Sequence, residues 1–179
     1  MTRFWSNLLS SMPANERYSV SSYGDFLTTN KALLNAACDR QKIIPNYRAL
    51  LFAMAMVETT TFSSANRDTS KDGSISSNVS LFNLNVDIVH TINPSIVPST
   101  LNDPKYLDSA ILIVIKAVEM WGVVRFLNFM RGGRTGFNDG VSFDCYGYRN
   151  TIATILRVLD AQPSLFNDSR RVNILLEYV

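Results

Sequence analysis

The chain has 179 residues, is 46% hydrophobic and carries a formal net charge of +2. This length suits one domain with a substantial core. The 17 basic residues are scattered along the sequence, which argues against a dedicated nucleic-acid binder with a concentrated basic face.

No apolar run approaches the roughly 18 residues that a membrane span needs, so we expect no membrane partner. The first residues lack the apolar segment of a secretory signal, and we expect a cytoplasmic protein unless a leader has been removed. Two cysteines and one histidine leave too few good ligands for a zinc site. We therefore expect no metal.

The first half of the chain predicts an arm followed by two helices. Residues 1–21 are expected to form an irregular N-terminal arm, and residues 22–179 a single globular domain. Ser22 is a plausible N-cap for a helix over 23–42, which has an approximate 3.6-residue apolar period. A second helix over 46–60 is apolar on nearly all sides, which is typical of a central, buried helix.

Loops and helices alternate after that point. Residues 63–79 are rich in Ser, Asn, Asp and Gly and predict a long loop. The segment 79–92 fits a strand or a helix, and we favour a short helix. A long helix is expected over 105–129, with Gly122 as a point of weakness.

The last third begins with a glycine-rich loop over 131–140. Helices are then expected over 148–161 and from Asp168 or Ser169 to the end of the chain. The signal for β-structure is weak throughout. The predicted class is therefore mainly α, a single domain built around a buried helix, with or without a small β-element.

Glu58 is the residue that most suggests chemistry. Nine apolar residues, 49–57, lead directly into it. A carboxyl group in such surroundings favours its protonated form, which a general acid requires. The alternative is a structural carboxylate paired with Arg131 or Arg134.

Asp68 and Asp72 follow Glu58 within a polar, glycine-containing stretch. Solvated carboxylates there stay ionised and suit the second carboxylate of glycoside hydrolysis. The alternative is a pair of solvated turn residues with no chemical role.

Two short segments resemble motifs of the lysozyme superfamily, which includes lytic transglycosylases and chitosanase-like enzymes. Residues 58–62, Glu-Thr-Thr-Thr-Phe, are similar to the Glu-Ser-x-Phe turn of transglycosylases. Residues 79–85 lie where those enzymes carry Gly-Leu-Met-Gln-Ile, although the glycine and the glutamine are missing. Residues 136–140 weakly match a Tyr-Asn-Gly-type segment. The main resemblance covers residues 47–90.

This resemblance implies a lysozyme-like domain that cleaves a β-linked amino-sugar polymer without a metal or organic cofactor. Glu58 would be the general acid, with Asp68 or Asp72 as the second carboxylate. The side chains expected to contact the polysaccharide are Thr60, Asn83, Asn85, Phe137 and Asn138. The alternative is a non-catalytic binding or self-assembling structural module on a lysozyme-like or other all-α fold.

Overall fold

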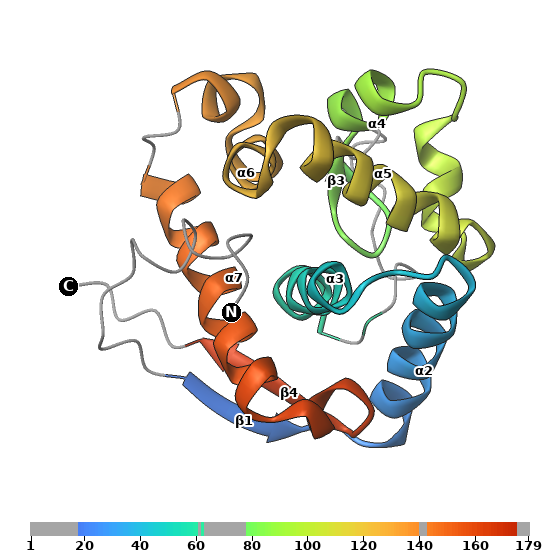
Figure 1. Cartoon of the computed structure of the whole chain (residues 1–179), viewed down its shortest axis with the longest axis vertical. Helices are drawn as coiled ribbons and strands as arrows, with labels where there is room; N and C mark the ends of the chain where they lie inside the picture. Colours follow the sequence, from blue (N-terminus) through green and yellow to red (C-terminus); the bar gives the residue numbers. More distant parts are fainter. Residues whose placement is uncertain (1–17, 61, 63–77, 140–142, 175–179) are drawn as a thin grey trace, which may run out of the picture.

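The computed structural model describes residues 18–60, 62, 78–139 and 143–174. Over these residues the protein is a mainly α domain with six helices and two small antiparallel sheets (Figure 1). In chain order the helices and strands are β1 (Tyr18–Ser22), α2 (Asp25–Arg40), α3 (Pro45–Glu58), β2 (Asn78–Val79), β3 (Leu84–Asn85), α4 (Val86–Ile92), α5 (Leu107–Trp121), α6 (Val123–Asp139), α7 (Phe143–Ala161) and β4 (Arg170–Ile174). Three short 3₁₀ helices are η1 (Pro98–Asn102), η2 (Pro104–Tyr106) and η3 (Pro163–Phe166).

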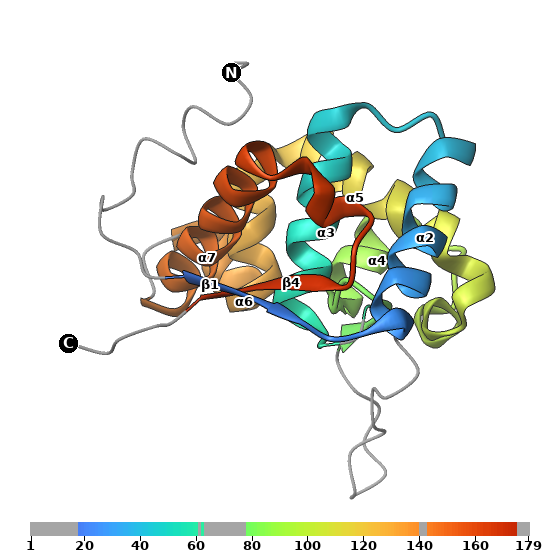
Figure 2. The same cartoon turned by 90° about the horizontal axis from the view of Figure 1, so that it is seen from below.

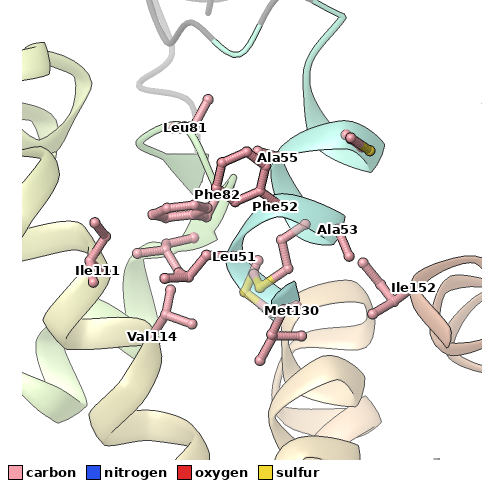
Figure 3. Packing of buried hydrophobic residues seen from close by; sticks show 14 of the residues in the cluster. Leu51, Phe52, Ala53, Ala55, Leu81, Phe82, Ile111, Val114, Met130 and Ile152 are labelled. Atoms are coloured by element: carbon pink, nitrogen blue, oxygen red, sulfur yellow. The ribbon is translucent and has the colours of Figure 1, made fainter. Parts of the chain in front are cut away.

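Helix α3 lies at the centre of the molecule, with α2, α5, α6 and α7 around it (Figure 1). All seven residues from Leu50 to Met56 are fully buried, so the prediction of a central buried helix is confirmed. Figure 3 shows why no face of α3 is polar, since its side chains meet Ile111 on α5, Met130 on α6 and Ile152 on α7.

The ends of α3 differ slightly from the predicted range of 46–60. Pro45 occupies the first turn, where its missing N–H costs no hydrogen bond, and the cap is Ile44 and not Asn46. The helix ends at Glu58 because the backbone of Thr59 is extended, with φ −139° and ψ 141°. The last residue of the most buried helix is therefore the candidate acid.

Two segments from opposite ends of the chain form a sheet that the sequence did not predict. Strand β1 pairs antiparallel with β4, from Tyr18 opposite Ile174 to Ser22 opposite Arg170 (Figure 2). The expected helix beginning at Asp168 or Ser169 is thus wrong for residues 170–174. Residues 18–21 of the expected irregular arm are likewise a strand, while residues 1–17 lie outside the described part. Val20 and Val172 face each other across the pair, and Val172 is buried.

The long helix expected over 105–129 is two helices. Gly122 adopts φ 77° and ψ 154°, a conformation that favours glycine, and ends α5 after Trp121. Its N–H still bonds to the carbonyl of Val118 at 2.8 Å. A new helix, α6, begins at the next residue, so the break reorients the chain and costs few hydrogen bonds.

The segment 131–140, expected to be a loop, is helical through Asp139. Helix α6 contains one non-helical residue, Gly133, with φ 58° and ψ −147°. Gly136 allows close packing, because a Cβ atom there would lie 2.4 Å from the backbone oxygen of Asn128. Gly133 therefore allows a kink in α6, and Gly136 allows a close contact with the backbone of Asn128.

Two further boundaries shift. Helix α2 starts at Asp25 after Gly24, and the predicted cap Ser22 instead bonds through its hydroxyl to Ser169 at 2.9 Å. The short helix expected over 79–92 is confirmed only in its second half, as α4, and its first half is the β2–β3 hairpin.

Lys31 is a fully buried cation that joins α2 to the C-terminal segment. Its ammonium group donates to the carbonyl oxygen of Leu165 at 2.6 Å and to that of Arg170. The Asp168 carboxylate lies 3.7 Å away and the Phe62 ring centroid 5.8 Å away. Burial lowers the pKa of Lys31 to about 8, although the charge of Asp168 acts in the opposite direction.

This buried amine predicts a pH-dependent stability. The folded chain binds fewer protons at Lys31 than the unfolded chain between pH 8 and 10.5, so its contribution to the free energy of unfolding rises as the pH rises through this window. From the size of the shift, the rise amounts to up to about 3 kcal/mol. Urea melts of the parent and of Lys31→Met at several pH values measure the difference. If the two curves stay parallel from pH 7 to 10.5, Lys31 keeps its proton in the fold.

Cys38 and Cys145 are both buried and free. Burial raises the pKa of Cys38 to about 11, which keeps it a neutral thiol. Among the described residues, no helix is long and apolar enough to cross a membrane.

Candidate functional site

The candidate site begins with the turn that follows Glu58. The Thr59 hydroxyl donates to the carbonyl oxygen of Ala55 at 2.9 Å and accepts from the N–H of Phe62 at 3.1 Å. One side chain therefore bonds both to the last turn of α3 and to the N–H of Phe62. Glu58 itself is half-buried.

The second part of the site is the turn between β2 and β3. The Asn83 side-chain amide donates to Glu58 Oε2 at 2.7 Å, although the two residues lie 25 positions apart. Because an amide nitrogen only donates, it fixes Oε2 as the acceptor oxygen of the carboxyl group.

Hydrogen bonds within this turn, and one from the turn to Asn102, hold Asn83 in place. The N–H of Ser80 bonds to Asn102 Oδ1 at 2.8 Å, and the Ser80 hydroxyl accepts from the N–H of Phe82 at 3.1 Å. The N–H of Asn83 bonds to the Ser80 carbonyl at 3.2 Å. Ser80 is fully buried, and its hydrogen bonds hold the turn in one conformation.

Three residues around Glu58 have left-handed backbones without being glycine. These φ values are 57° at Phe62, 70° at Ser80 and 55° at Asn83. Asparagine tolerates this region, but serine and phenylalanine do so at a cost of roughly 1–3 kcal/mol each. Such costs persist where the surrounding structure demands a particular geometry, and functional sites are a common place for them.

Arg171 on β4 satisfies the end of α3. Its guanidinium donates to the Met56 carbonyl through Nε, at 3.1 Å, and through Nη2. The last carbonyls of a helix have no partner within it, and a cation there also opposes the negative end of the helix dipole. The guanidinium carbon also lies 5.8 Å from the ring centroid of Tyr23, the residue that follows β1.

The other site residues predicted near Glu58 differ in their surroundings. Thr60 is exposed two residues after it. Asn85 caps α4, since its side-chain oxygen accepts from the N–H of Asp87 at 2.8 Å. Asp68 and Asp72 lie outside the described residues.

Phe137 and Asn138 lie near the end of α6. The Phe137 ring packs against Trp121 and Phe129, with centroids 5.3 Å away in both cases. The Arg125 guanidinium carbon lies 5.1 Å from the Phe137 centroid, so this ring takes part in a packed aromatic cluster. Asn138 is exposed.

Of the two arginines considered as partners of Glu58, Arg134 pairs with Asp87, with Nε 3.4 Å from Oδ2. Arg131 is exposed. The described part of the chain contains no cluster of His, Cys, Asp and Glu that could hold a metal ion.

Sequence reasoning missed Ser80 and Arg171. Ser80 carries no clear signal in the sequence, and its positive φ of 70° is seen only in the structure. Arg171 carries no local signal, since its partner Met56 lies 115 positions away. Compared with known proteins, the chain matches no family model and no curated protein.

Proposed function

We propose that this protein is a lysozyme-like enzyme, a glycoside hydrolase or lytic transglycosylase, that cleaves a β-linked amino-sugar polymer with Glu58 as the general acid. The observation that carries the proposal is the hydrogen bond from Asn83 to Glu58 Oε2. It joins the two segments on which the resemblance rests, residues 58–62 and 79–85.

The proton chemistry follows from this bond. Since Oε2 accepts from Asn83, we assign the acidic proton of the proposed mechanism to the other carboxyl oxygen, Oε1. Oε1 donates it to the glycosidic oxygen as the bond to the leaving sugar breaks. The half-buried position of Glu58 supports its role, because partial desolvation favours the protonated form.

The β2–β3 turn supports the same function. Read in register with Gly-Leu-Met-Gln-Ile, residues 80–84 are Ser-Leu-Phe-Asn-Leu. Asn83 then supplies the amide of the missing glutamine, and Ser80 adopts the left-handed backbone that glycine adopts readily. Asp68 or Asp72 remains the proposed second carboxylate. Thr60, Phe137 and Asn138 remain proposed substrate contacts.

The direct test is cleavage of chitin, chitosan and peptidoglycan fragments by the full chain from about pH 4 to 8, the range in which a carboxylic acid catalyst works. Release of reducing ends or of anhydro-sugar products distinguishes hydrolysis from transglycosylation. If the chain cleaves none of them across this range, a non-catalytic binding or self-assembling module is the better account.

The role of Asn83 predicts a selective loss of activity. Because its φ is 55°, Asn83→Gly removes the amide without straining the backbone. Because Glu58 acts as the protonated acid, this is a hydrogen bond between neutral groups, and its loss should lower kcat/KM by roughly 2- to 10-fold. Lys42→Gly replaces another left-handed residue, with φ 53°, and should keep full activity. Equal activity in both variants would show that Asn83 does not orient the acid.

A further inference from the structure

Lys31 contacts the candidate site from outside α3. Its ammonium nitrogen lies 5.8 Å from the ring centroid of Phe62, the residue whose N–H bonds to the Thr59 hydroxyl at 3.1 Å. Thr59 directly follows Glu58 and caps α3. The Phe62 ring is buried and also packs against Phe52 of α3, with centroids 5.7 Å apart. Lys31, on α2, is thus two contacts away from the residue that follows the proposed acid.

The backbone of Phe62 needs support from its surroundings. Its φ of 57° is a left-handed value that is costly for a bulky side chain. Such a conformation persists only where neighbouring contacts outweigh its cost. A cation within about 6 Å of the centroid of an aromatic ring attracts the ring, and more strongly where water is excluded. Lys31 is fully buried, so its attraction for the Phe62 ring is one such contact.

The ammonium group of Lys31 makes two kinds of contact. It donates hydrogen bonds to the carbonyl oxygens of Leu165, at 2.6 Å, and of Arg170. The Asp168 carboxylate, 3.7 Å away, and the Phe62 ring are attracted by its charge. A neutral amine keeps two N–H groups, which is enough for the two carbonyls. Loss of the proton therefore weakens the contacts with Asp168 and Phe62 and leaves the hydrogen bonds to the C-terminal segment in place.

The charged side chains that act on Lys31, among the described residues, both lie on the C-terminal segment. Burial has the largest effect on the pKa of Lys31 and lowers it to about 8, while Asp168 acts to raise it and Arg170 to lower it. The turn after Glu58 contributes the uncharged ring of Phe62. Lys31 therefore carries its charge at pH 7 and loses it as the pH rises through about 8.

We propose that Lys31 is a positioning residue of the Glu58 site, whose charged ammonium group holds the ring of Phe62 and thereby the turn that orients the acid. Its role in catalysis rests on the proposed function. Glu58 is the last residue of α3, so a shift of this turn changes the position of its carboxyl group relative to Asn83. The proton on Lys31 thus couples the pH of the solution to the geometry of the site.

The first experiment follows the Phe62 ring directly and needs no activity. NMR spectra of the full chain labelled with ¹³C-phenylalanine are recorded from about pH 6.5 to 9.5, which brackets the pKa of Lys31. The Phe62 ring signals should shift with a midpoint near pH 8. The control is the ring of Phe126, which is fully buried on α6 and should give constant signals. The leucine variant of each phenylalanine assigns its signals.

A change in a neighbouring carboxylate shows whether Lys31 is the titrating group. Asp168→Asn removes a charge that raises the pKa of Lys31. The midpoint of the Phe62 signals should therefore move to lower pH by about 0.2 to 0.7 pH units, the size expected for a partly exposed ion pair. Asp160→Asn is the matched control, since Asp160 is an exposed aspartate of α7, and should leave the midpoint unchanged.

Kinetics test the consequence for the proposed reaction, on whichever of chitin, chitosan or peptidoglycan fragments the parent cleaves. Lys31→Met keeps the bulk of the side chain without its charge. It should lower kcat by roughly 10-fold or more and change KM by less than about twofold, because the acid moves and the binding surface does not. Phe62→Leu should act similarly, and the double variant should lose little more than either single variant. Lys116→Met, at an exposed lysine of α5, is the control and should keep full activity.

The outcomes separate this inference from the proposed function. Phe62 signals that stay constant over the titration, or a midpoint that Asp168→Asn does not move, would overturn the role of Lys31 even in an active enzyme. Additive losses in the double variant would do the same. Conversely, a Phe62 titration that Asp168→Asn moves, in a chain that cleaves no polymer, would keep the link between Lys31 and the turn and reject the catalytic role.

Discussion

Replacing Glu58 with glutamine should lower turnover of the cleaved polymer by about 10²- to 10⁴-fold, the usual contribution of a general acid. Glutamine is nearly isosteric and keeps an oxygen that accepts from Asn83, but it has no acidic proton to donate to the leaving sugar. Initial rates of the parent and the variant on the same polymer give the ratio.

The same variant should keep the melting temperature of the parent nearly unchanged, because the packing around α3 is preserved. Glu119→Gln is the matched control, since Glu119 is an exposed glutamate of α5, and it should retain full activity. A large fall in melting temperature for Glu58→Gln, with a parent that cleaves nothing, would instead assign Glu58 a structural role.

The second large effect is on stability. Met54 is fully buried in the middle of α3, so Met54→Ala leaves a cavity among side chains that belong to several helices. We expect a loss of about 2–5 kcal/mol in the free energy of unfolding, from the lost transfer energy and the cavity. Urea denaturation followed by circular dichroism measures it.

Met120→Ala gives the comparison, because Met120 is 55% exposed on α5. Its cost should stay within about 0.5 kcal/mol, as for most surface substitutions. A cost for Met54→Ala no larger than that of Met120→Ala would contradict the central position of α3.

The sequence was informative where a helix is defined by its own residues. Helix α3 could be predicted because its apolar run has no polar face, and such a run can only be buried. Helices α2 and α7 followed from their apolar period, with errors of a few residues at their ends. Gly122 was recognised as a weak point, but the complete break there depends on how α5 and α6 pack, which no local pattern records.

The strands were missed because each depends on a distant partner. Residues 170–174 form a strand by pairing with residues 18–22, and the β2–β3 hairpin has only two residues in each strand. Strand preference depends strongly on context, so short segments give little signal.

The candidate site divides in the same way. Glu58 could be singled out from its apolar surroundings, and Asn83 from a short motif. The contact between Glu58 and Asn83 could be seen only in the folded structure. The same holds for the hydrogen bond from Arg171, because its partner is a backbone carbonyl of α3 and not a particular side chain. Phe137 was expected to contact substrate because aromatic rings suit sugars, yet its neighbours Trp121 and Phe129 show that it also serves packing.

The pairing of β1 with β4 has a consequence for the order of folding. Its ends lie about 150 residues apart in sequence, so closing it carries a large loop entropy and must await most other contacts. Arg171 and the carbonyl group of Arg170, which accepts from Lys31, both belong to this closing strand. The geometry of the helix end that carries Glu58 therefore depends on the C-terminal strand as well as on the residues of α3 itself.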